Sequence, residues 1–199
     1  ITILGPVPTR AAEGPNDMVS AGSSSALSPP LLLSPVGLSL LFAVFVAMHF
    51  QSLTGLSLSI DDDTAILRTD PSIWLHEGRW GAYLVERFIM PLPAITFLPY
   101  AVFGACLCLA FALLAISLGI TTLSWEILLG FALFVGVPQW LFLMEFSANI
   151  VPIGIGFLCA AASVVTLDRA AAQRRGIPER LAFVGASVGL LALATGLYQ

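Results

Sequence analysis

The chain contains no lysine, only two histidines and very few charged side chains of any kind. Charged residues make up 10% of its 199 residues and hydrophobic residues 58%, and the mean hydropathy is +0.95. The core of a soluble protein of this length cannot enclose so much apolar side chain. The scarcity of charge therefore excludes an ordinary soluble domain and indicates an integral membrane protein, embedded in the lipid bilayer.

All 8 of the Lys and Arg positions are arginine, and the net charge is −4. No basic cluster is large enough to neutralise several phosphates, which excludes nucleic acid as a partner. Three cysteines is an odd number, and none has the Cys-x-x-Cys spacing of a metal site. Cys106, Cys108 and Cys159 all fall inside apolar stretches, so we expect small residues that face lipid or other helices.

Five apolar stretches approach the roughly 20 residues that a helix needs to cross a bilayer. They cover residues 33–53, 95–119, 124–145, 150–167 and 181 onward. The predicted fold is all-α: a polytopic transmembrane helix bundle over residues 31–199, preceded by a disordered Pro/Ser-rich tail at 1–30. Because the last stretch ends still apolar, we expect the domain to be truncated at its carboxyl end.

Arginine counts near the membrane ends predict the orientation. Segment 168–180 carries four arginines, whereas the longer loop 54–94 carries three among six carboxylates. The first segment should therefore be cytoplasmic. Counting spans backward places loop 54–94 outside and the amino terminus in the cytoplasm.

Loop 54–94 is the polar part of the chain, and its second half has helical periodicity. Aromatic and apolar side chains recur there at spacings of three and four residues: Trp80, Tyr83, Leu84 and Phe88. Such a helix should lie along the membrane surface with its aromatic side in the headgroup layer. The first half of the loop holds three consecutive carboxylates, Asp61 to Asp63. They can supply a general base or a cation site, or they can simply end the first span and stay solvated.

The arrangement of these motifs resembles a known family. An apolar span is followed by Asp62-Asp63, then by Arg68, then by Gly78-Arg79-Trp80 at the start of the amphipathic helix. Pro138 and the closing Tyr198-Gln199 add looser matches. Over about residues 33–199 the chain resembles the amino-terminal region of bacterial membrane glucosyltransferases of the O-antigen-modifying type II family.

The resemblance implies a GT-C-like enzyme of the bacterial cytoplasmic (inner) membrane. Such an enzyme transfers a sugar from a polyprenyl-phosphate donor to a cell-surface glycan acceptor such as O-antigen. Asp62 or Asp63 would be the catalytic base, and Arg68 and Arg79 would bind the donor phosphate. Trp80 and Tyr83 would hold the polyprenyl chain or stack on a sugar, or they are interfacial anchors. No cofactor is required, although three carboxylates are compatible with a divalent cation.

Three further features lie within the spans or at their ends. Glu145, at the predicted outer end of the third span, is either a second carboxylate of the site or an interfacial residue. Pro138 should kink the third helix, with the freed carbonyl satisfied inside the bundle. The glycine pairs Gly185-x-x-x-Gly189 and Gly154-x-Gly156 should allow close helix approach.

His49 supports an alternative function. A histidine near the end of a span can ligate a pigment magnesium or a haem. The chain would then be a non-catalytic accessory subunit that packs against other membrane proteins in a pigment or electron-transfer complex and uses loop 54–94 for docking.

Overall fold

The computed structural model describes residues 31–54, 70–89, 97–144, 147–172 and 176–198. Within these ranges the chain forms helices and turns and no strand. The predicted tail at 1–30 and much of loop 54–94 lie outside them. The all-α prediction is confirmed.

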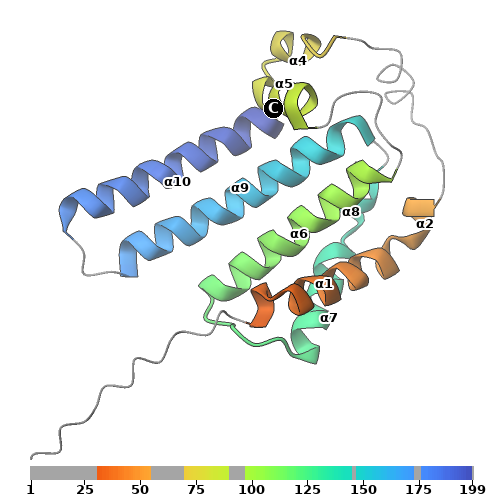
Figure 1. The fold of residues 1–199 in the computed structure, drawn as a ribbon, viewed down its shortest axis with the longest axis horizontal. Helices are drawn as coiled ribbons and strands as arrows, with labels where there is room; N and C mark the ends of the chain where they lie inside the picture. The colour runs from red at the N-terminus through yellow and green to blue at the C-terminus, as the bar shows by residue number, and fades with distance from the viewer. Residues whose placement is uncertain (1–30, 55–69, 90–96, 145–146, 173–175, 199) are drawn as a thin grey trace, which may run out of the picture.

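Three apolar helices are long enough to cross a membrane: α6 (Leu98–Ser117), α9 (Ser147–Ala172) and α10 (Ile177–Tyr198). They lie side by side, with α9 in contact with both α6 and α10 (Figure 1). The chain runs in the same direction through α6 and α9 and returns through α10. This arrangement is a polytopic membrane helix bundle, as the apolar stretches predict.

Small residues set the spacing of these three helices. A methyl group on Gly154 of α9 would lie 2.9 Å from the ring of Phe103 on α6, and one on Gly156 would lie 3.3 Å from the Ala194 carbonyl on α10. Further along, the Ser163 hydroxyl donates a hydrogen bond to the Ser187 carbonyl at 3.0 Å. The Ser187 hydroxyl donates one to the Ser163 carbonyl at 3.1 Å. The Gly154-x-Gly156 prediction is confirmed. The Gly185/Gly189 prediction is wrong for the described residues, because both glycines face open space.

The first predicted span, 33–53, is interrupted. A short turn at Leu31–Leu33 precedes α1 (Pro35–Met48), which begins where the Ser34 hydroxyl accepts the Gly37 N–H at 3.1 Å. The helix ends at His49, and a separate short helix, α2 (Phe50–Thr54), follows. At 14 residues α1 is about 21 Å long, which is less than the roughly 30 Å of the hydrocarbon core.

The third predicted span, 124–145, consists of two helices, α7 (Trp125–Val135) and α8 (Pro138–Leu143). Pro138 has no N–H to donate to the Phe134 carbonyl four residues earlier, and its ring would clash there. The Trp140 indole N–H bonds that carbonyl instead, at 2.8 Å. Pro138 therefore breaks the helix rather than kinking it, and the prediction that the freed carbonyl finds a partner is confirmed.

The last two helices also extend beyond their predicted limits. The predicted span 150–167 and loop 168–180 become a helix that continues to Ala172 and a second one that starts at Ile177. Alanines at 170–172 favour continuation, and Pro178 fits the first helical turn.

The core lies between α1, α6, α7 and α9. Phe45, Phe103 and Phe131 are fully buried there. Cys106, Cys108 and Cys159 are also buried and free, which confirms that they face other helices.

Candidate functional site

The structure describes some of the predicted site residues and not others. Asp62, Asp63, Arg68 and Glu145 lie outside the described ranges, so their roles stay predictions. Arg79, Trp80 and Tyr83 are described, together with the end of the loop that carries them.

The described part of the loop is a helical hairpin. It starts at Asp70, whose carboxylate accepts the Ser72 N–H at 3.0 Å. Helix α4 (Ile73–His76) follows, and Gly78, with a φ of 78°, turns the chain back. That left-handed conformation suits glycine. The chain then enters α5 (Trp80–Leu84) and a π-helical turn at Val85–Ile89.

The hairpin is held together by Trp74, which is buried on α4. Its indole N–H donates a hydrogen bond to the Glu86 carboxylate in the π-helical turn. Its carbonyl accepts the Arg79 N–H at 2.7 Å. Trp74 therefore joins both segments of the hairpin and fixes the backbone of Arg79.

Arg79 lies with its guanidinium over the Trp74 ring, its Cζ 4.6 Å from the ring centroid. Its Nη1 is 4.0 Å from the Glu77 carboxylate, and 13% of the side chain is exposed. Its buried Nε has no hydrogen-bond partner within the described part of the chain. Burial lowers the pKa of the guanidinium, and the Glu77 charge opposes this. Arginine starts so high that the group stays cationic at neutral pH.

Helix α5 packs on the last turn of α10, beside the end of the chain (Figure 1). A methyl group on Gly81 would lie 2.8 Å from the Gly196 backbone, and one on Gly196 would overlap the Trp80 indole. Two glycines thus permit direct contact between the two helix backbones. The contact places Arg79, one residue before Trp80, at one end of the spanning bundle.

The hairpin also carries a strip of partly exposed apolar side chains. Trp80, Leu84 and Phe88 are 43%, 40% and 73% exposed and follow one another at intervals of four residues. Gly81, Ala82 and Val85 are buried beneath them, and Tyr83 is half-buried. This is the amphipathic pattern of an interfacial helix. Trp80 packs on α10, while substrate contacts of Trp80 and Tyr83 stay predictions.

His49 has a structural role. Its Nε2 is 3.0 Å from the Val135 carbonyl at the end of α7, and its ring lies 4.8 Å from that of Phe45. The side chain is 2% exposed. The imidazole thus joins α1 to α7 through Nε2, while its buried Nδ1 has no hydrogen-bond partner among the described residues. Ligation of a pigment or haem stays a prediction.

Sequence reasoning missed Trp74, Glu86 and Gly196. Trp74 and Glu86 are twelve residues apart and meet only because Gly78 reverses the chain, so no periodicity connects them. Gly196 contacts a residue more than a hundred positions away. Gly78 is a local signal that could have pointed to the reversal, because glycine favours the left-handed conformation found there. Among the described residues no three His, Cys, Asp or Glu side chains gather at a metal site, and the cation prediction concerns Asp61 to Asp63, which lie outside them.

The fold and the hairpin together define a class: a polytopic membrane protein with a helical hairpin that carries Arg79 at one end of its bundle. Comparison with known families makes the class specific. Residues 50–199 match the glucosyl transferase GtrII family, and the chain belongs to that family of membrane glucosyltransferases. The chain matches no curated protein and no solved structure.

Proposed function

We propose that the protein transfers glucose from a polyprenyl-phosphate donor to a cell-surface glycan such as O-antigen. The reaction takes place at the outer face of the bacterial cytoplasmic membrane, with loop 54–94 outside and the amino terminus in the cytoplasm. Family membership supports glucosyl transfer. The observation that supports the lipid-phosphate donor is Arg79, a cation held at the end of the spanning helices.

The surroundings of Arg79 suit a phosphate ligand. Its buried Nε is free of partners within the described residues, and its contact with Glu77 is long, at 4.0 Å. A guanidinium presents parallel N–H groups that match two phosphate oxygens. The contact with the Trp74 ring restrains the guanidinium, so binding a phosphate requires little reordering of this side chain.

The chemistry assigned to the loop is a direct displacement. Asp62 or Asp63 takes the proton of the acceptor hydroxyl, and the hydroxyl oxygen attacks the anomeric carbon of glucose. The bond from that carbon to the donor phosphate breaks, the configuration inverts, and polyprenyl phosphate leaves. Arg79, with Arg68, stabilises the negative charge on the departing phosphate. Glu145 is assigned as a second carboxylate of the site, and Trp80 and Tyr83 as contacts to the donor. The mechanism needs no cofactor, and a divalent cation at the aspartates would be compatible with it.

The test is glucose transfer by membranes that carry Arg79→Lys. Lysine keeps the charge but loses the planar pair of donors, so we expect the KM for the lipid donor to rise about tenfold. Arg87→Lys is the matched control, because Arg87 is exposed on the same hairpin and should leave KM unchanged. A parental KM in Arg79→Lys would contradict the phosphate assignment.

A further inference from the structure

Two helix breaks meet inside the apolar part of the chain. Helix α1 ends with His49 as its cap, α7 ends at Val135, and the imidazole Nε2 lies 3.0 Å from the Val135 carbonyl. A carbonyl oxygen only accepts hydrogen bonds, so Nε2 carries the proton and donates it. Because Val135 is the last residue of α7, its carbonyl has no partner within that helix. His49 therefore caps the end of α7 from the end of α1.

The last turn of α1 is fixed in the core. Phe45 is fully buried, and a methyl group on Gly104 of α6 would overlap its ring. A methyl group on Gly136, just after α7, would lie 3.1 Å from the Met48 side chain. Helix α1 is thus held against both α6 and α7 as far as His49.

The helix that follows, α2, lacks such support. His49 joins it to α1 through the backbone, since its N–H donates to the Phe45 carbonyl at 3.0 Å and its carbonyl accepts the Leu53 N–H at 2.9 Å. Within the described part of the chain, none of the five residues of α2 is buried. The direction of α2 therefore depends on how His49 is held.

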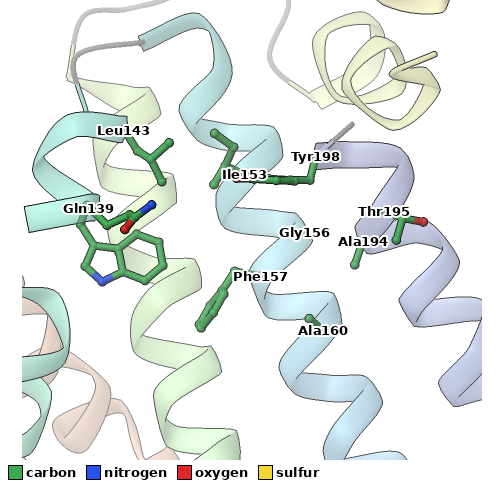
Figure 2. A pocket seen from close by; sticks show the side chains of 10 residues that line it. Gln139, Leu143, Ile153, Gly156, Phe157, Ala160, Ala194, Thr195 and Tyr198 are labelled. Atoms are coloured by element: carbon green, nitrogen blue, oxygen red, sulfur yellow. The ribbon is translucent and has the colours of Figure 1, made fainter. Parts of the chain in front are cut away.

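The segment after the other break is packed as loosely. No residue of α8 is buried in the described structure, and a pocket of about 400 Å³ lies between Gln139 and Leu143 of α8 and the helices α9 and α10 (Figure 2). Helix α8 is nevertheless tied to α7, because the Trp140 indole N–H bonds the Phe134 carbonyl at 2.8 Å. At each break, one side chain caps a carbonyl near the end of α7 and anchors a loosely packed helix.

We propose that His49 is a positioning residue for glucosyl transfer: its bond to Val135 sets the direction in which α2 leaves the bundle. The proposal rests on the proposed function, which makes loop 54–94 the catalytic loop, and α2 is the helix from which that loop starts. The buried Nδ1 of His49 has no hydrogen-bond partner among the described residues, which is unfavourable. An apolar side chain of similar size would avoid this cost but could not cap Val135.

The direct test is a distance measurement on the protein in nanodiscs by double electron–electron resonance. Spin labels at Gln51→Cys on α2 and Leu129→Cys on α7 report the direction of α2. Labels at Leu40→Cys and Leu129→Cys are the matched control, because they report α1 itself. All three sites are exposed, and the native cysteines are buried. We expect His49→Asn to broaden the distance distribution of the first pair and to leave that of the control pair unchanged.

Two further variants isolate the hydrogen bond. Asparagine is too short to reach Val135, whereas His49→Gln places an amide N–H near the position of Nε2 and should keep the parental distribution. His49→Leu fills the site without a donor and should act like His49→Asn. A parental distribution in folded His49→Asn or His49→Leu would overturn the proposal. Equal broadening in His49→Gln, or a change in the control pair, would also overturn it.

Glucose transfer separates positioning from structural support alone. A displacement of about 1 Å can lower a rate about 10²-fold, so kcat should fall by up to about 100-fold in His49→Asn and recover in His49→Gln. The KM for the lipid donor should stay parental, because Trp74 of the hairpin, and not α2, holds Arg79. A parental kcat together with broadened distances would show that the direction of α2 does not matter for the reaction, and the positioning role would be wrong.

Failure of this inference can be distinguished from failure of the proposed function. Glucose transfer by the parent, with parental distances in folded His49→Asn, would overturn the role of His49 and leave the function standing. Broadened distances in His49→Asn without glucose transfer by the folded parent would contradict the function and support His49 as the anchor of α2.

Discussion

Arg79 depends on Trp74 for its position. The indole ring supports the guanidinium, the indole N–H reaches Glu86, and the Trp74 carbonyl fixes the Arg79 backbone. Trp74 therefore joins both segments of the hairpin to Arg79, the residue proposed to bind the phosphate.

Trp74→Phe tests how much the indole N–H of this residue contributes to the stability of the hairpin. Phenylalanine keeps an aromatic face under Arg79 but removes the N–H that bonds the carboxylate, so we expect a loss of about 1–2 kcal/mol in the free energy of unfolding. The measurement is denaturant-induced unfolding in detergent. Trp125→Phe is the control, since Trp125 is 68% exposed and should change stability by less than about 0.5 kcal/mol. Equal stability of the two variants would show that the hydrogen bond between Trp74 and Glu86 does not stabilise the protein.

The sequence identifies Arg79 but not its partners, and the reason is physical. Gly-Arg-Trp before an amphipathic helix marks Arg79 as the residue that starts the helix. Trp74 reaches it through a left-handed turn at Gly78, and a reversal of this kind leaves no periodic signal in the sequence. The position of a side chain in a hairpin depends on contacts that short-range patterns do not encode.

At the scale of the element, the contact between α5 and α10 decides where the hairpin sits. Gly196 lies against the Trp80 indole, whereas Gly189, two turns earlier on the same helix, faces open space. The same substitution should therefore have opposite effects at the two sites.

Gly196→Ala should destabilise the protein by about 1–3 kcal/mol, because its methyl group would displace Trp80. Gly189→Ala should stabilise it by about 0.5–1 kcal/mol through helix propensity alone. Thermal unfolding reports both changes, and protease cleavage within the hairpin should speed up only in Gly196→Ala. Matching gains in stability at both positions would mean that α5 does not pack on α10 as described.

Apolar length predicts α6, α9 and α10 because a continuous spanning helix satisfies its own backbone and needs no specific partner. It misjudges the segments around His49 and Pro138, where helices end within an apolar stretch. There the side chains of His49 and Trp140 bond the carbonyls of Val135 and Phe134. Those contacts stabilise two shorter helices in place of one long one, and hydropathy does not contain them.

At the scale of the whole molecule, the proposed reaction requires the hairpin to be outside the cell. His76 is exposed on α4, and Asp168 is exposed near the opposite end of the bundle. The native cysteines are buried, so they should contribute little background. We expect His76→Cys to react with a membrane-impermeant maleimide in intact cells and Asp168→Cys to react only after permeabilisation. The reverse pattern would contradict the orientation and with it a reaction at the outer face.

The central claim is that loop 54–94 is the catalytic loop of a glucosyltransferase. The most direct test is glucose transfer from a polyprenyl-phosphate donor by membranes that carry Asp62→Asn, Asp63→Asn or the control Asp168→Asn. Loss of a general base lowers the rate by about 10²–10⁴-fold, so transfer should fall by that amount in one of the first two variants and stay at the parental rate in the control. Parental rates in both Asp62→Asn and Asp63→Asn, at equal expression, would contradict the claim.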